Sequence, residues 1–189
     1  MSYNQTMRTI HSITEQYLSP ALEMVKATFT ESDSEKEALF VCRLITEIRS
    51  KKYYLPELEL IMTDDDNSVI GYAMFSRFHI EGKYEDELLI LTPVAVKTEF
   101  QRQHISKDLI EYGFRKAKEL GFKAVLVEGN PANYTSRGFE PSYKHGIVAG
   151  PKIKLPRPEC LMIKELVPGA LKNLTGTVDY SLYDCLNEE

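Results

Sequence analysis

Cysteine is scarce in this sequence. The three cysteines, Cys42, Cys160 and Cys185, are odd in number and far apart, and no C-x-x-C pair occurs. A disulfide framework or a zinc ribbon would need paired or closely spaced cysteines. We therefore expect reduced thiols, as in a protein of the cytoplasm.

Long apolar runs are missing as well. No stretch approaches the roughly 18 consecutive apolar residues that mark a membrane-spanning helix. The N-terminal stretch MSYNQTMRTIHSITEQ is polar and lacks the apolar centre of a signal peptide. These two absences predict a cytoplasmic protein with no membrane partner.

Signatures of several functional classes are also absent. The sequence contains no G-x-S-x-G nucleophile elbow, no P-loop and no G-x-G-x-x-G fingerprint. The histidines show no metal-ligand spacing with each other or with cysteine, which predicts no metal site. The formal net charge of −5 disfavours a nucleic-acid partner, because such binders usually carry a basic face.

What is present is typical of a globular chain. With 189 residues, 43% of them hydrophobic, a single domain over residues 1–189 is expected. Ser19-Pro20 and the capping-box pair Ser34 and Glu37 predict the starts of two helices. Residues 1–13 are expected to hold a first strand, because Met7–Ile13 alternates weakly.

A hairpin is predicted next. Two apolar runs, residues 58–62 and 69–80, are joined by the acidic stretch Asp64–Ser68. This stretch lacks the spacing of a calcium-binding loop, so we interpret it as a turn.

The stretch Leu88–Leu120 has the pattern of a strand, a polar elbow and a helix. Leu88–Val96 is almost entirely apolar, as in a strand buried on both faces, yet it contains Pro93, which cannot donate a ladder hydrogen bond. An amphipathic helix follows the elbow and stops at Gly121, and Phe122–Glu128 follows as another strand. A strand, helix and strand of these lengths predict a parallel right-handed crossover, whose helix start attracts anions.

The remaining elements are shorter. Asn130-Pro131 predicts a helix start, with Asn130 as the capping residue. Cys160–Val167 is predicted to be a late strand and Val178–Tyr183 a last one.

Three ordered motifs suggest a family. They are L-x-P-V-A-V-x-x-x-x-Q at residues 91–101, Y-x-x-x-G-F-E-P at residues 134–141, and L-V-P-G-A-L at residues 166–171 followed by G-T-V-D-Y at residues 176–180. Together the motifs resemble the GNAT N-acyltransferase superfamily, in particular its YhbS-like branch of N-acetyltransferases. The resemblance is good over residues 57–183 and holds only in outline before them.

The resemblance implies an α/β protein of the α+β type with the GNAT fold. Its central mixed sheet would be largely antiparallel, splayed at the acyl-CoA site and flanked by helices. It also implies an N-acetyltransferase that moves an acetyl group directly from acetyl-CoA, its acyl donor, to a small-molecule or peptide amine. Many relatives dimerise, so the resemblance allows a homodimer.

The resemblance further implies cofactor-binding residues. Val94, Ala95 and Val96 would lie along the pantetheine arm, with the backbone of Val94 and Val96 pairing to it, and Asn130 would lie near the same arm. The pyrophosphate would bind at the elbow and helix start, formed by Gln101, Arg102, Gln103, His104, Ile105 and Ser106.

The elbow departs from the family pattern, because His104 and Ser106 replace two glycines of the motif. A Cβ atom at either position would crowd the phosphates. The alternative hypothesis is therefore a ligand- or protein-binding module that has lost CoA binding through this elbow.

The resemblance places Tyr134 as the general acid that protonates the leaving thiolate. Glu128 is the best placed general base, Glu87 and His79 are weaker candidates, and a water chain would serve without any single base. The loop between the first two helices and the segment Lys144–Pro158 are expected to shape the acceptor pocket. Three cations in that segment suggest either an acidic acceptor or an ordinary solvated loop; they are Lys152, Lys154 and Arg157.

Overall fold

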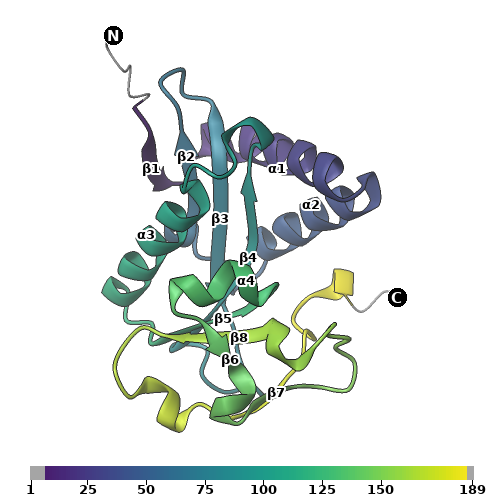
Figure 1. Cartoon of the computed structure of the whole chain (residues 1–189), viewed down its shortest axis with the longest axis vertical. Coiled ribbons are helices and arrows are strands. Elements are labelled where there is room, and N and C mark those ends of the chain that lie inside the picture. Colours follow the sequence, from purple (N-terminus) through teal and green to yellow (C-terminus); the bar gives the residue numbers. More distant parts are fainter. Residues whose placement is uncertain (1–6, 187–189) are drawn as a thin grey trace.

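The computed structural model describes residues 7–186, and a seven-stranded sheet forms its centre (Figure 1). The strands lie in the order β1-β2-β3-β4-β5-β8-β6, and only the pairing of β4 with β5 is parallel. Their bounds are β1 Thr9–Ser12, β2 Glu59–Thr63, β3 Val69–Arg77, β4 Leu88–Val96, β5 Ala124–Glu128, β6 Glu140–Pro141 and β8 Leu161–Glu165. This is the mixed, largely antiparallel sheet that the family resemblance implied.

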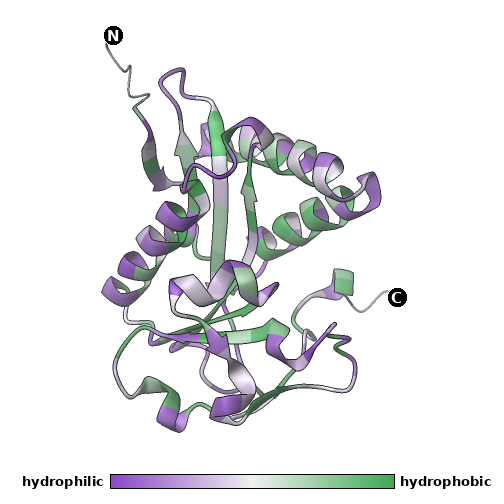
Figure 2. Cartoon of the chain, in the orientation of Figure 1, coloured by the Kyte–Doolittle hydropathy of each residue, from purple (hydrophilic) through white to green (hydrophobic). Residues whose placement is uncertain are grey.

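Helices cover both faces of the sheet. Helices α1 (Leu18–Ser32) and α2 (Glu35–Ser50) pack on one face, and α3 (Ile105–Glu119) packs on the other (Figure 1). Figure 2 shows hydrophobic residues gathered in the strands and on the helix sides that face them. Strand β3 contributes Tyr72 to one core and Phe75 to the other, which explains why the central strands have continuous apolar sequences.

The local signals for the helix ends are mostly confirmed. The Ser34 hydroxyl accepts the backbone N–H of Glu37 at 3.1 Å, and Asn130 Oδ1 accepts the N–H of Ala132 at 3.0 Å. The latter caps the short helix α4, Pro131–Tyr134. Gly121 follows α3 with a φ of 94°, as a C′ glycine does. Helix α1 starts at Leu18, so Ser19 and Pro20 lie in its first turn and Ser19 is not the cap.

The predicted hairpin is confirmed as the antiparallel pair β2 and β3. One carboxylate organises its turn, because Asp64 Oδ1 accepts the backbone N–H groups of Asp66 at 3.0 Å and Ser68 at 2.9 Å. This local capping is why an acidic run forms a turn here.

The sheet parts between β4 and β5. Residues Leu88–Ile90 of β4 pair with Ala124–Leu126 of β5, but β4 continues to Val96 beside β3 alone. Along β3 the register shifts, so Thr92 and Pro93 stand opposite the single residue Met74. Pro93, which cannot donate a ladder hydrogen bond, therefore lies in a bulge, and this bulge lies where the two strands diverge.

The end of the chain differs from the prediction. The last strand is β9, Gly176–Val178, and it pairs in parallel with β7, Ile147–Ala149. Val178–Tyr183 is not a strand, because the Asp179 side chain accepts the N–H of Ser181 at 2.9 Å and turns the chain. Across residues 7–186, every helix is too short or too polar to reach across a lipid bilayer.

Candidate active site

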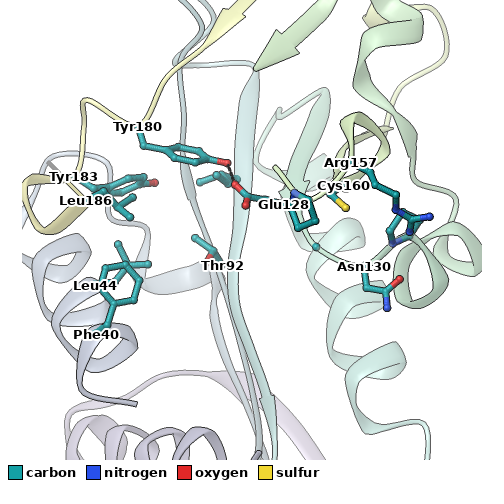
Figure 3. Close-up of a pocket in the computed structure, with 14 residues that line it drawn as sticks. Phe40, Leu44, Thr92, Glu128, Asn130, Arg157, Cys160, Tyr180, Tyr183 and Leu186 are labelled. Atoms are coloured by element: carbon teal, nitrogen blue, oxygen red, sulfur yellow. Dashed lines mark hydrogen bonds between the residues drawn. The ribbon is translucent and has the colours of Figure 1, made fainter. Parts of the chain in front are cut away.

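Two cavities open near the parting of β4 and β5. The first, of about 800 Å³, lies beside α3, and we call it the α3-side cavity. The second, of about 540 Å³, lies between α2, the end of β5 and the C-terminal segment, and we call it the α2-side cavity (Figure 3).

The lining of the α3-side cavity combines β4, the elbow, the start of α3 and α4. Its residues are Val94, Val96, Phe100, Gln101, Arg102, His104, Ile105, Ser106, Lys107, Ile110, Asn133, Tyr134, Ser136 and Arg137. The lining of the α2-side cavity is more apolar. Its residues are Phe40, Leu44, Ile90, Thr92, Glu128, Gly129, Asn130, Pro131, Pro156, Arg157, Cys160, Tyr180, Tyr183 and Leu186.

The backbone of β4 offers hydrogen-bonding groups to the gap. Lys97 N–H donates to Ile70 of β3 at 3.0 Å, and Ala95 stands opposite Tyr72 two residues earlier in the same ladder. Because bonding direction alternates along an antiparallel pair, Val94 and Val96 direct their backbone groups away from β3, toward the gap. Ala95 instead bonds to β3, and its side chain is buried in the core under α1 and α2.

The elbow has an unusual backbone. Arg102 has a φ of 61° and His104 a φ of 65°, in the left-handed region that favours glycine. His104 directly precedes α3, its side chain is exposed, and no side chain caps the helix. The first intrahelical bond runs from Asp108 N–H to His104 O, at 2.9 Å. The N–H groups of Ile105, Ser106 and Lys107 therefore have no partner within the helix, as at an anion-binding helix start.

Cationic side chains surround that helix start. Arg102, Lys107 and Arg137 all line the α3-side cavity. Arg137 donates from Nη2 to the hydroxyl of Ser106 at 2.9 Å, and from Nη1 to the carbonyl of Asn133. Its buried Nε has no hydrogen-bond partner among the described residues. A guanidinium is thus fixed beside the helix start by one of the residues that replace glycine.

Tyr134 ends α4 and lines the same cavity. Its ring meets Phe139 edge-on, with ring centroids 5.6 Å apart. Gly129 allows this position, because a Cβ atom there would lie 2.5 Å from the Tyr134 ring. Burial raises the pKa of the Tyr134 phenol, although the nearby charge of Arg137 acts in the opposite direction. The phenol therefore keeps its proton at neutral pH and is a hydrogen-bond donor.

The α2-side cavity contains a carboxylate held by a tyrosine. Tyr180 donates its hydroxyl proton to Glu128 Oε2 at 2.5 Å, as the dashed line in Figure 3 shows. Burial, followed by the charge of Glu128, raises the pKa of Tyr180 well above its usual value. Tyr180 is therefore a permanent donor, and it orients the carboxylate at the end of β5.

The predicted site residues divide between the two cavities. Of the cofactor-binding set, Ala95 and Gln103 line neither, and Gln103 is engaged by Arg8 and by the carbonyl of Glu99. Asn130 caps α4 and lines the α2-side cavity, as does Glu128. The other members, and Tyr134, line the α3-side cavity.

The weaker candidates for the general base lie elsewhere. Glu87 pairs with Lys123 at 2.9 Å, and His79 accepts the N–H of Gly82 at 3.1 Å. Neither residue lines either cavity. Glu128 is the carboxylate that the fold places at the parting of the strands.

The expected walls of the acceptor pocket need correction. The loop between α1 and α2 lines neither cavity, and α2 itself supplies Phe40 and Leu44. Of the three cations singled out, only Arg157 lines the α2-side cavity, while Lys152 and Lys154 are exposed. Arg137, Tyr183 and Leu186 are not among the predicted site residues, and Tyr180 is quoted only within a motif. Among residues 7–186, no group of histidine, cysteine or acidic side chains could hold a metal ion.

Comparison with known proteins identifies the family of this chain. Residues 21–140 match the model of the acetyltransferase (GNAT) family. The chain is 28% identical over 163 residues to a protein of Escherichia coli K12 described as uncharacterized N-acetyltransferase YhbS, covering 86% of this chain and 90% of that one.

Solved structures show the same fold. The crystal structure of Escherichia coli YhbS in complex with CoA superposes with a TM-score of 0.80, at 24% identity, covering 99% of this chain and 96% of the other. A GNAT acetyltransferase of Brucella melitensis in complex with acetyl-CoA gives a TM-score of 0.59, at 24% identity, covering 71% and 83%.

Proposed function

The chain belongs to the acetyltransferase (GNAT) family and is an acetyl-CoA-dependent N-acetyltransferase, and we propose that acetyl transfer takes place where β4 and β5 part. One observation carries this proposal: the two sides of the parting differ in chemistry. One cavity has a helix start with three cations, and the described lining of the other has one carboxylate, Glu128, beside one cation, Arg157. An anionic donor and a cationic acceptor would thus approach the gap from different cavities.

The α3-side cavity fits acetyl-CoA. Its pyrophosphate would accept the N–H groups of Ile105, Ser106 and Lys107, with Arg102 and Arg137 adding positive charge. The pantetheine arm would pair with the backbone of Val94 and Val96, as a further strand does at a sheet edge. The CoA and acetyl-CoA complexes of the two structural relatives support this assignment.

The replacement of glycine at His104 and Ser106 is compatible with this role. His104 has the left-handed backbone that glycine would adopt, so the elbow keeps the shape that exposes the helix amides. Ser106 is inside the helix and fixes Arg137. These features favour the enzyme over a binding module without CoA.

Each cavity would supply one of the two residues that transfer protons. Glu128 would accept a proton from the acceptor ammonium, directly or through water, and the free amine would attack the thioester carbonyl carbon. A C–N bond forms, and the C–S bond breaks with its electron pair on sulfur. Tyr134 would donate its phenolic proton to that sulfur, and the second amine proton would restore the phenol. The products are an amide, the CoA thiol and one released proton.

Thermal unfolding tests cofactor binding. Acetyl-CoA at 100 times its Kd should stabilise the protein by about 2.7 kcal/mol and raise its Tm. Desulfo-CoA should bind similarly, because the phosphate contacts are unchanged. An unchanged Tm at millimolar acetyl-CoA would refute the proposed site.

Tyr134→Phe tests the general acid. We expect an unchanged Tm shift with acetyl-CoA and a kcat lowered roughly 100-fold, as for other lost acid–base groups. Tyr112→Phe, on α3 and in the lining of neither cavity, is the matched control and should keep full kcat. Equal kcat for Tyr134→Phe and the parent protein would remove Tyr134 from the mechanism.

A further inference from the structure

Apolar and charged side chains occupy different parts of the lining of the α2-side cavity. On one side α2 and the C-terminal segment present the side chains of Phe40, Leu44, Tyr183 and Leu186 (Figure 3). Glu128 projects near the parting of the strands, and among residues 7–186 its carboxylate is the only one in the lining. The cavity therefore combines a broad apolar wall with one negatively charged group, the Glu128 carboxylate.

The hydrogen bonding of Glu128 limits what binds there. Tyr180 donates to Oε2 only, so the carboxylate retains acceptor sites facing the cavity. An ammonium group, with three N–H donors and a positive charge, matches those sites. The same ammonium is the group that acetylation must reach.

The rest of the cavity disfavours a second charge or a strongly polar body. A second ammonium would lie against the apolar wall or near the guanidinium of Arg157, and the polar side chains Thr92 and Asn130 in the described part of the lining carry no charge to neutralise it. An apolar body loses no hydrogen bonds there and removes apolar surface from water. A volume of about 540 Å³ suits a small molecule of ring size.

We propose that the acceptor is a primary amine carried on a compact apolar group, such as an aromatic ring or a branched alkyl chain. Glu128 holds its ammonium, and the wall formed by Phe40, Leu44, Tyr183 and Leu186 holds its apolar body. This proposal rests on the acetyltransferase function above and specifies its substrate class.

An amine panel tests the proposal. The release of CoA thiol from acetyl-CoA is measured with 2-phenylethylamine, isoamylamine, ethanolamine and spermidine. We expect kcat/KM for 2-phenylethylamine to exceed that for ethanolamine on the order of 100-fold, because only the former buries a ring. Spermidine should be as poor as ethanolamine. A higher kcat/KM for either polar amine would overturn the assignment.

A matched pair of variants locates the effect. Leu186 is 36% exposed and lines the cavity, whereas Leu120 is 47% exposed at the end of α3 and lines neither cavity. Leu186→Gln should raise KM for 2-phenylethylamine about 10-fold and leave the Tm shift with acetyl-CoA unchanged. Leu120→Gln should change neither quantity. Equal KM values for the two variants would show that the apolar wall does not contribute to substrate binding.

The Tm shift and the amine panel distinguish a failure of the proposed function from a failure of the proposed acceptor class. If acetyl-CoA produces no Tm shift, the proposed function fails, and the acceptor class fails with it. If acetyl-CoA binds and only polar amines accelerate thiol release, the function stands and the apolar acceptor is wrong.

Discussion

Two glutamates on strands of the same sheet have opposite surroundings. Glu59, the first residue of β2, is 0% exposed and accepts hydrogen bonds from Arg49, Tyr54 and Tyr72. Glu128, the last residue of β5, is exposed to a cavity and accepts a side-chain hydrogen bond from Tyr180 alone among the described residues. Both carboxylates have tyrosine donors, but only the first is fully enclosed by protein.

The difference separates a structural carboxylate from the one that we propose as the proton acceptor. The acceptor sites of Glu59 are filled by groups of α2, β3 and the segment before β2, so it ties these elements together and has no room for substrate. Glu128 keeps sites open beside the parting of the strands. A buried charge with complete bonding fixes a fold, whereas an oriented but incompletely bonded one is available for proton transfer.

The largest expected effect comes from breaking the enclosed network. Glu59→Ala leaves the Arg49 guanidinium and the Tyr72 hydroxyl without their shared partner, which should cost about 3–5 kcal/mol of unfolding free energy. Glu57→Ala, at an exposed position two residues earlier, is the control and should cost less than about 0.5 kcal/mol. Urea denaturation measures both. A loss below about 1 kcal/mol for Glu59→Ala would show that the network is not structural.

Glu128→Gln should lower activity strongly and change stability little, the opposite of what we expect for Glu59→Ala. Glutamine keeps an acceptor for Tyr180 but cannot take a proton, so kcat/KM with an amine acceptor should fall roughly 100-fold or more. The unfolding free energy should change by less than about 1 kcal/mol. Glu119→Gln, on the exposed end of α3, is the charge-matched control. Wild-type kcat/KM in Glu128→Gln would leave proton removal to water.

Glu47 offers a third carboxylate between these extremes. Its side chain is 13% exposed, and it accepts Lys51 Nζ at 2.9 Å and the N–H groups of Asp184 at 2.6 Å and Cys185 at 2.9 Å. Desolvation is the largest single influence and raises its pKa, but these bonds together outweigh it and lower the pKa from 4.5 to about 2. Glu47 thereby anchors the segment that carries Tyr183 and Leu186.

The sign of its pH dependence follows from the lowered pKa. The carboxylate stabilises the fold fully above about pH 4.5, and this stabilisation is lost as the pH falls toward 2. Glu47→Gln should reduce the unfolding free energy at pH 7 by about 2 kcal/mol and flatten its decline between pH 5 and 2. Urea denaturation across that pH range measures both effects. If the unfolding free energy of Glu47→Gln declined between pH 5 and 2 as steeply as that of the parent protein, the proposed role of Glu47 would be contradicted.

The smallest effects come from the tyrosine partners, and they sharpen the comparison most directly. Tyr72→Phe removes one donor from the enclosed Glu59 and should cost about 1–3 kcal/mol of stability with little change in kcat. Tyr180→Phe removes the donor from Glu128 and should cost less than about 1 kcal/mol of stability, but it should lower kcat/KM about 10-fold because the carboxylate loses its orientation. Denaturation and steady-state kinetics on both variants test this crossing pattern. Similar changes in stability and in kcat/KM for the two variants would contradict the difference between Glu59 and Glu128.

Much of the fold could be predicted because its signals are local. The Ser34 and Asn130 caps, the Asp64 turn and the stop at Gly121 depend on hydrogen bonds or backbone angles within a few residues. The strand, helix and strand from Leu88 to Glu128 follow from periodicity and crossover handedness. The family motifs added the splayed sheet and the expectation that Tyr134 is the general acid.

Only the tertiary structure decided which side chains meet. Tyr180 reaches Glu128 across 52 positions, and Arg137 reaches Ser106 across 31. Glu59 carries no sign in the sequence that it is buried, because its partners come from a helix, a loop and the next strand. Such pairings depend on how elements pack, whereas caps and turns depend only on neighbouring residues. The sequence by itself therefore determined the elements and the family, and packing determined the chemistry of each cavity.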